Sequence, residues 1–372
     1  MAEAVQTAGK ANKVILILGL PDRFESEGYE RKHLMIPSCQ IELIDRIYEV
    51  NKNIAVVLYN GAPVEMPWLH KVKALVEAYL CGEAVGQATA DVLFGRVNPS
   101  GHLPETFPLR LEDTPCFLTY NKDVRKASYS EDVFVGYRYY DTRKTDVLFP
   151  FGFGLSYTTF DITNIHCPES YIQGMEKFVV TADVVNTGVL KGKAVIQLYI
   201  APVNSNVPRP SHELRAFDKI ELMPGETKAV VFELEQRDFS YWDCQTSSWL
   251  AEQGNYRIEI GFSSRDIVCC NEITLISEKT SLHQYTVNTT IGELMNDPVA
   301  VRILTPYFNI MRDAFGMSQQ KSETDRAMND DMANAMFANL PLRSISSFAD
   351  SKADYDTLSN IIEEINRILL TE

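Results

Sequence analysis

The first half of the chain alternates short apolar runs with segments of helical spacing. Residues 14–20 are apolar or glycine, and residues 54–59 and 72–80 form two further apolar runs of strand length. Helices are predicted at residues 2–12, from Ser38 as a capping residue after Pro37, and at residues 83–94. Alternating strands and helices predict a parallel sheet with helices on both faces, so the run at 14–20 is expected to be buried on both sides.

The pattern changes twice in the second half. Residues 160–270 contain short strand-like runs separated by turn residues, which is typical of an antiparallel β-sandwich. After Glu272 helical spacing returns, and Leu358, Ile362 and Ile365 lie on one stripe of a last helix. The predicted fold class is multidomain: a partial α/β parallel-sheet domain at residues 1–108, a linker at 109–158, an all-β sandwich at 159–276 and a helical extension at 277–372.

Aromatic residues are dense between residues 129 and 157, where several stand next to glycine. Such a cluster could stack on sugar rings, but aromatic side chains between turn-forming glycines more often pack two domains together. We therefore expect this segment to connect the α/β domain to the sandwich.

Composition and charge exclude some classes of binding partner for this chain. The 372 residues carry a formal net charge of −15, which argues against nucleic acid and anionic membranes as partners and suits a neutral ligand such as a sugar. No apolar run approaches the roughly 20 residues of a membrane span, and the first residues lack the pattern of a signal peptide, so a cytoplasmic location is expected. The seven cysteines and six histidines show no metal-site spacing, so we expect free thiols and no metal or other cofactor.

An acidic stretch, Glu-Ser-Glu-Gly-Tyr-Glu-Arg at residues 25–31, follows the first predicted strand. The carboxyl ends of parallel strands are where α/β folds bind ligands, so this stretch is expected at a cleft. Gly28 allows a sharp turn that projects Glu27, and Arg31 is within reach to pair with Glu25 or with the adjacent glutamate. A glutamate on a loop is by itself most often a solvated surface residue, so this position alone does not establish a role.

The same stretch, followed by Leu34, Pro37 and Gln40, resembles the signature of family 3 glycoside hydrolases. Further segments that match the family are residues 60–64, 66–68, 90–95 and 98–104. The sandwich resembles the fibronectin-III-like domain of the family, and residues 340–348 resemble an extension that many bacterial members carry.

The resemblance implies a retaining glycoside hydrolase of β-glucosidase type that acts on β-glucosides or oligosaccharides, with Glu27 as the general acid/base. Such an enzyme needs one protonatable carboxyl group and a second carboxylate about 5 Å away as the nucleophile. The residues that the resemblance implies bind substrate or shape the site are Glu25, Gly28, Tyr29 and Arg31.

In this family the nucleophile is an aspartate on a separate TIM-type barrel, which has no counterpart in this sequence. The resemblance therefore implies the C-terminal half of an enzyme, truncated or split, whose barrel comes from another chain or from missing sequence. Because early strands of the sheet are absent, an exposed edge strand is expected to promote association, including homo-oligomers. Two functions stay open: a hydrolase part that supplies Glu27, and a non-catalytic carbohydrate-binding or structural module or inactive gene fragment.

Overall fold

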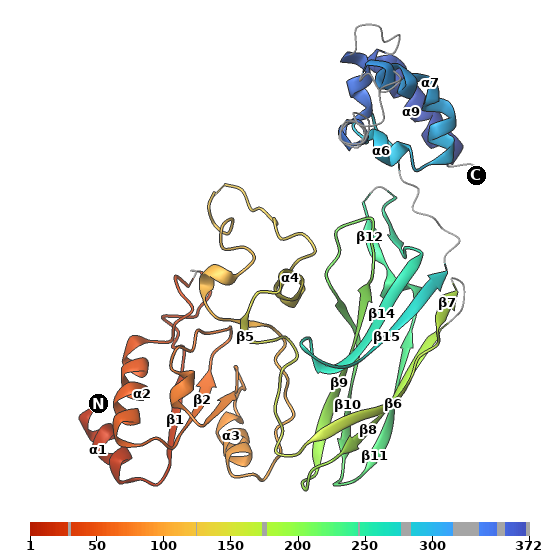
Figure 1. Ribbon diagram of the computed structural model, residues 1–372. Coiled ribbons are helices and arrows are strands. Elements are labelled where there is room, and N and C mark those ends of the chain that lie inside the picture. Colours follow the sequence, from red (N-terminus) through yellow and green to blue (C-terminus); the bar gives the residue numbers. More distant parts are fainter. Residues whose placement is uncertain are drawn as a thin grey trace, which may run out of the picture. The chain divides into compact units, whose positions relative to one another are not determined.

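The computed structural model describes residues 1–28, 31–123, 125–172, 177–244, 246–276, 284–314, 335–347 and 354–369 (Figure 1). The chain divides into two compact units. The first contains Met1–Ser240 and Ala251–Glu278, and the second contains Tyr241–Leu250 and Lys279–Glu372. Among the described residues, every helix is too short or too polar to cross a membrane.

The first unit begins with a three-stranded parallel sheet of order β1-β2-β3. Its elements are α1 (Ala2–Lys10), β1 (Val14–Gly19), α2 (Ser38–Val50), β2 (Ile54–Tyr59), η1 (Leu69–Lys71), β3 (Ala74–Glu77) and α3 (Val85–Leu93). Ile44 and Ile47 of α2 pack against the sheet core that includes Val56 and Leu58 of β2. The predicted parallel α/β sheet is confirmed. Helices on both of its faces are not found among the described residues, because α3 contributes no residue to the core. The predicted cap is wrong, because Pro37 is the capping residue of α2 and makes no side-chain capping bond.

Strand β1 differs from the prediction in its burial. Leu16 and Leu18 are buried in the core with α1 and α2, but Ile15 is 45% exposed and Ile17 is 64% exposed. Strand β2, in the middle of the sheet, is buried on both faces. The prediction that β1 is buried on both sides is therefore wrong, because β1 is an edge strand with only one face covered by the described residues. The expected exposed edge is present.

Gly19 ends β1 at the point where the chain enters the acidic stretch. A Cβ atom at this position would lie 2.1 Å from the Tyr59 carbonyl oxygen of β2. The Gly19 amide also donates to Gln40 Oε1 at 3.1 Å, and Gln40 Nε2 donates to the Gly19 carbonyl at 2.9 Å. A side chain at Gly19 must therefore separate β1 from β2.

We expect Gly19→Ala to lower the free energy of unfolding by about 1–3 kcal/mol, because overpacking forces the backbone to shift. Urea unfolding followed by circular dichroism measures this loss. Gly9→Ala is the matched control, because the nearest atom to a Cβ at Gly9 is 3.7 Å away and alanine favours the helix α1. Equal unfolding midpoints for the two variants would contradict the expectation.

The segment that connects the sheet to the sandwich has its own structure, namely β4 (Phe107–Pro108), η2 (Leu111–Asp113), α4 (Tyr137–Arg143) and β5 (Val147–Phe149). Strands β4 and β5 pair antiparallel. The hydrophobic pattern does not predict α4, which carries Tyr137. The Tyr137 ring stacks on Phe151 with centroids 4.4 Å apart, and its hydroxyl accepts a hydrogen bond from the Leu214 amide at 2.7 Å. The aromatic residues thus pack this segment against the sandwich, as predicted.

The rest of the first unit is the predicted β-sandwich (Figure 1). Its sheets have the orders β10-β9-β14-β15-β7 and β11-β8-β6, and alternate residues of β8 and β11 point into the shared core. Pairing is antiparallel except between β15 and β7. The elements are β6 (Phe160–His166), β7 (Ser170–Ile172), β8 (Phe178–Asn186), β9 (Gly192–Pro202), β10 (Glu213–Leu222), β11 (Thr227–Leu234), α5 (Gln236–Phe239), β14 (Gly254–Ser263) and β15 (Asp266–Ile276).

The second unit contains a β-hairpin and a helical core. Its elements are β12 (Tyr241–Asp243), β13 (Ser248–Leu250), α6 (Ile291–Leu294), α7 (Pro298–Ala314), η3 (Leu342–Ser347) and α9 (Tyr355–Leu369). Leu304 and Phe308 of α7 share a core with Leu358, Ile362 and Ile365 of α9. The predicted apolar stripe of the last helix is confirmed, and it packs against other segments of this same unit.

Candidate functional site

The acidic stretch follows β1, and residues 60–65 follow the neighbouring strand β2. Because the two strands are parallel, both segments lie at the same edge of the sheet. The chain after the stretch also runs beside the segment after β2, since the Glu65 amide donates to the Leu34 carbonyl at 2.9 Å. This edge is where the sequence predicts the ligand site.

Glu25 ties the acidic stretch to the segment after β2. Its Oε2 atom accepts a hydrogen bond from the Gly61 amide at 2.6 Å. Arg31 makes no ion pair with Glu25 among the described residues; instead its Nη1 atom donates to the Pro63 carbonyl at 3.1 Å. The half-buried guanidinium thus uses a backbone acceptor, which corrects the predicted Glu25 pairing. Burial lowers the pKa of Arg31, although the carboxylates of Glu25 and Glu65 oppose this shift.

Glu27 and Gly28 form the exposed tip of the stretch. Gly28 has a φ of +92°, in the left-handed region that favours glycine, which is the sharp turn that the sequence predicts. Glu27 is solvent-exposed, and the structure records no hydrogen bond or ion pair between its carboxylate and any described residue. Tyr29 and the glutamate that follows it lie outside the described residues. The described part of the chain therefore presents Glu27 without burying it.

A second carboxyl group, Glu77, lies at the carboxyl end of β3. Its Oε1 atom accepts from the Tyr79 amide at 2.9 Å, and its Oε2 atom accepts from Asn60 Nδ2 at 3.4 Å. Burial raises the pKa of Glu77 to about 7, the nearby carboxylates of Glu105 and Glu25 add to this, and the two hydrogen bonds oppose it. Glu77 lies at the end of an apolar run, and no local sequence signal distinguishes it.

These contacts link the loops that follow all three strands. Glu25 binds the Gly61 amide, the adjacent Asn60 binds Glu77, and the Tyr79 hydroxyl donates to Glu105 Oε1 at 3.3 Å. The acidic stretch is thus held to the sheet by Glu25, while Glu27 stays free of the network.

We expect Glu25→Ala to speed hydrogen exchange of the Gly61 amide by tenfold or more, since a hydrogen bond to a charged group is worth about 1.5–3 kcal/mol. Exchange followed by mass spectrometry or NMR measures this. Glu65→Ala is the reciprocal control, because Glu65 Oε1 accepts from the Leu111 amide at 3.0 Å and should affect exchange there. Unchanged Gly61 exchange in Glu25→Ala would refute the anchoring role.

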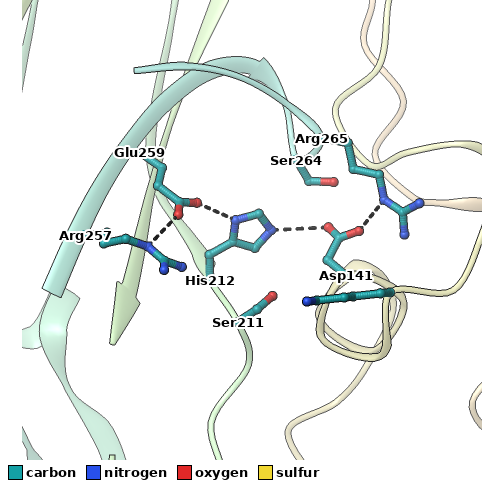
Figure 2. Close-up of a pocket in the computed structure, with 8 residues that line it drawn as sticks. Asp141, Ser211, His212, Arg257, Glu259, Ser264 and Arg265 are labelled. Carbon is teal, nitrogen blue, oxygen red and sulfur yellow. Dashed lines mark hydrogen bonds and ion pairs between the residues drawn. The ribbon is translucent and has the colours of Figure 1, made fainter. Parts of the chain in front are cut away.

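A cavity of about 350 Å³ lies elsewhere in the first unit, between α4 and the sandwich. Figure 2 shows the His212 ring between two carboxylates, with an arginine beyond each of them. His212 Nδ1 is 2.7 Å from Glu259 Oε2, and His212 Nε2 is 3.2 Å from Asp141 Oδ2. Arg257 Nε donates to Glu259 Oε1 at 3.1 Å, and Arg265 Nε donates to Asp141 Oδ1 at 2.6 Å. Positive and negative groups therefore alternate across the cavity.

The charges of this cluster support one another. Burial alone would lower the pKa of His212, but the hydrogen bonds and charges of Asp141 and Glu259 outweigh it and raise the pKa to about 9. Burial likewise opposes ionisation of the two carboxyl groups, yet His212 and the arginines leave both of their pKa values lowered. At neutral pH the histidine is an imidazolium between two carboxylates.

Sequence reasoning missed this cluster. Asp141, His212 and Glu259 are 71 and 47 residues apart along the chain, so no local motif contains them. The spacing of the six histidines gave no signal for a site, whereas His212 is a buried member of this polar cluster. In the described part of the chain, no group of His, Cys, Asp and Glu side chains could hold a metal ion, and the seven cysteines are free.

Two parts of the chain match known protein families. Residues 1–157 match the glycosyl hydrolase family 3 C-terminal domain, and residues 194–264 match a fibronectin type III-like domain. The chain belongs to glycoside hydrolase family 3. It corresponds to the C-terminal half of the family's β-glucosidases, as the sequence predicts. The first of the two matches includes residues 109–157, which we assigned to a linker.

Family 3 relatives extend over most of the chain. It is 41% identical over 366 residues to "Thermostable beta-glucosidase B" of Acetivibrio thermocellus, covering 98% of this chain and 48% of that protein. It is 40% identical over 304 residues to an exo-alpha-(1->6)-L-arabinopyranosidase of Bifidobacterium longum, covering 82% of this chain and 40% of that protein. The chain thus spans about half or less of the length of these relatives.

A solved family 3 structure shows the same fold. The β-glucosidase of Bifidobacterium adolescentis aligns with a TM-score of 0.72 and 41% sequence identity. The alignment covers 82% of this chain and 44% of that enzyme. More than half of the solved enzyme is therefore unmatched by this chain.

Proposed function

We propose that this chain is the C-terminal part of a retaining glycoside hydrolase of β-glucosidase type, in which Glu27 is the general acid/base. The observation that carries the proposal is the position of Glu27, at a glycine turn on the carboxyl edge of a parallel sheet, in a chain whose relatives include β-glucosidases. Gly28 makes the turn, Glu25 and Arg31 fasten its two sides, and Tyr29 stands within the same stretch.

The chemistry requires a second component. A retaining hydrolase needs a nucleophilic carboxylate about 5 Å from the acid/base, on the other side of the scissile bond. An acid/base group also works best near neutral pH when protein and a neighbouring carboxylate surround it and favour its protonated form. Glu27 is exposed here, so the surrounding wall and the nucleophile are proposed to come from a family 3 barrel domain.

The proposed reaction proceeds in two steps. Glu27 first gives its proton to the leaving glycosidic oxygen while the nucleophile of the barrel attacks the anomeric carbon and forms a glycosyl-enzyme bond. The Glu27 carboxylate then takes a proton from water, and the oxygen of that water displaces the nucleophile. The proposed substrates are β-linked glucosides such as cello-oligosaccharides.

Joining this chain to a family 3 barrel domain tests this proposal. The N-terminal half of the Bifidobacterium adolescentis enzyme is fused ahead of this chain, and release of an aryl alcohol from an aryl β-glucoside is measured. We expect turnover by the fusion and none by this chain alone. An aryl α-L-arabinopyranoside serves as the second substrate, because one relative is named as an exo-alpha-(1->6)-L-arabinopyranosidase. A fusion that is folded and monodisperse but cleaves neither substrate would overturn the proposal.

A further inference from the structure

The residues that line the cavity around His212 are all polar or charged. They contribute four cationic groups, two carboxylates and two hydroxyl groups: Asp141, Lys144, Ser211, His212, Arg257, Glu259, Ser264 and Arg265. With His212 as an imidazolium, the local formal charge is +2 in a chain whose net charge is −15. The cavity is therefore a local positive site on an acidic protein.

The acceptors of the cavity are already occupied. Both oxygens of Glu259 accept hydrogen bonds, one from His212 and one from Arg257. Both oxygens of Asp141 also accept, one from His212 and one from Arg265. Each carboxylate thus lies between two cations, so its negative charge is compensated within the cluster.

Several donors of the cavity, in contrast, have no recorded acceptor among the described residues. Arg257 uses only Nε, and Arg265 uses Nε and Nη2, the latter on the Thr145 carbonyl at 2.8 Å. The Arg257 side chain is 42% exposed and that of Arg265 is 31% exposed, so both can be reached by a ligand. Lys144 is exposed, and no hydrogen bond or ion pair joins its ammonium group to a described residue.

The two serines add hydroxyl groups to these donors. Ser264 is 3% exposed, and its hydroxyl makes no hydrogen bond of ordinary geometry with a described residue, although it is close enough to favour the ionised form of Asp141. Figure 2 shows Ser264 and Ser211 on opposite sides of the His212 ring. A surplus of donors with compensated acceptors fits a ligand that is rich in acceptor oxygens and carries negative charge.

We propose that this cavity binds a small oxyanion, namely inorganic phosphate or the phosphate group of a phosphorylated small molecule. Guanidinium groups match the tetrahedral oxygens of phosphate, and Lys144 supplies a further point charge. A volume of about 350 Å³ exceeds that of a phosphate ion, so a phosphate monoester also fits. The site contains no residue of the acidic stretch and is independent of the proposed hydrolase activity.

Isothermal titration calorimetry of the whole chain at low ionic strength tests the proposal, with inorganic phosphate and glucose 6-phosphate as the two probes. We expect saturable binding of at least one probe, weakened by added sodium chloride because salt screens the charges. The stronger of the two probes then identifies the source of the phosphate group. Absence of binding of both at about 10 mM, where a site of millimolar affinity is mostly filled, would overturn the proposal.

Two variants connect binding to this cavity. Arg257→Gln removes a guanidinium, and Lys144→Asn removes a charge at a residue whose φ of +58° asparagine adopts readily. Each should weaken binding about tenfold or more without unfolding the chain. Arg46→Gln is the control, since Arg46 is an exposed arginine that also pairs with a glutamate, Glu42. Equal affinities in all three variants would overturn the assignment to this site.

Discussion

In the fusion of this chain with a family 3 barrel domain, Glu27→Gln should lower the turnover of cellobiose about 10²–10⁴-fold, because a positioned acid/base contributes a factor of that size. Glutamine keeps the size of the side chain and loses the transferable proton. The exposed position of Glu27, free of the network that holds Glu25, means that the substitution removes no recorded contact. Unfolding midpoints of the variant and the parent should therefore agree.

The choice of substrate separates loss of proton transfer from general damage. The leaving group of a dinitrophenyl β-glucoside departs as dinitrophenolate and needs no protonation. Formation of the glycosyl-enzyme should therefore persist in Glu27→Gln and give a burst of dinitrophenolate before slow hydrolysis. Glu49→Gln, at an exposed glutamate of α2, is the control and should keep full activity. If Glu27→Gln cleaves cellobiose at the parental rate, Glu27 is not the acid/base.

His212→Ala should lower the free energy of unfolding by about 3–5 kcal/mol, the usual cost of removing one partner from a buried ion cluster. Asp141 and Glu259 would each lose a hydrogen bond and a compensating charge while staying largely buried. Urea unfolding near pH 6 measures the loss. His166→Ala is the control, because His166 is exposed at the end of β6 and should change little.

The same cluster predicts how stability depends on pH. The pKa of His212 is raised to about 9 in the folded chain, so its contribution is fully present below the ordinary pKa of 6.5 and is lost as the pH rises through 9. The loss over this range amounts to roughly 3 kcal/mol. Asp141 and Glu259 have lowered pKa values, so their contributions are present above their ordinary values and disappear as the pH falls through the lowered ones.

His212→Ala separates the effect of His212 on the pH dependence of stability from the effect of Glu77. The pKa of Glu77 is raised to about 7, so its own effect on stability falls between its ordinary pKa of 4.5 and 7. Between about pH 7 and 8.5, below the range in which the buried cysteine and tyrosine side chains contribute, unfolding free energies should therefore decline in the parent and decline much less in His212→Ala. Parallel curves for the two proteins would contradict a charged His212.

Much of the fold follows from local patterns in the sequence. Strand β2 is buried on both faces and reads as a continuous apolar run, and β8 and β11 alternate because one face of each points into the sandwich core. The burial of β1 could not be predicted this way, because an apolar run shows that a strand can be covered and not whether a neighbour covers it. Helix α4 was missed because its stability comes from packing, as at Tyr137, more than from an apolar stripe.

The candidate sites also differ in how far the sequence predicts them. The stretch around Glu27 is contiguous, so its glycine turn and its position after β1 could be predicted. The partner of Glu25 could not, because Gly61 belongs to another loop. The pKa values of Glu77 and His212 are raised by burial and by partners that are distant in the chain. Neither cause can be recognised from the neighbouring residues in the sequence.

The bare isoleucines of β1 also determine how this polypeptide behaves in solution. Covering a side chain of this size is worth about 1.5–3 kcal/mol, and Ile15 and Ile17 obtain only part of that gain. A polypeptide that binds this face of the folded sheet, and does not bind the unfolded chain, would raise the melting temperature of the sheet beneath it. Preparations of the chain should therefore become more heat-resistant as such a cover is added.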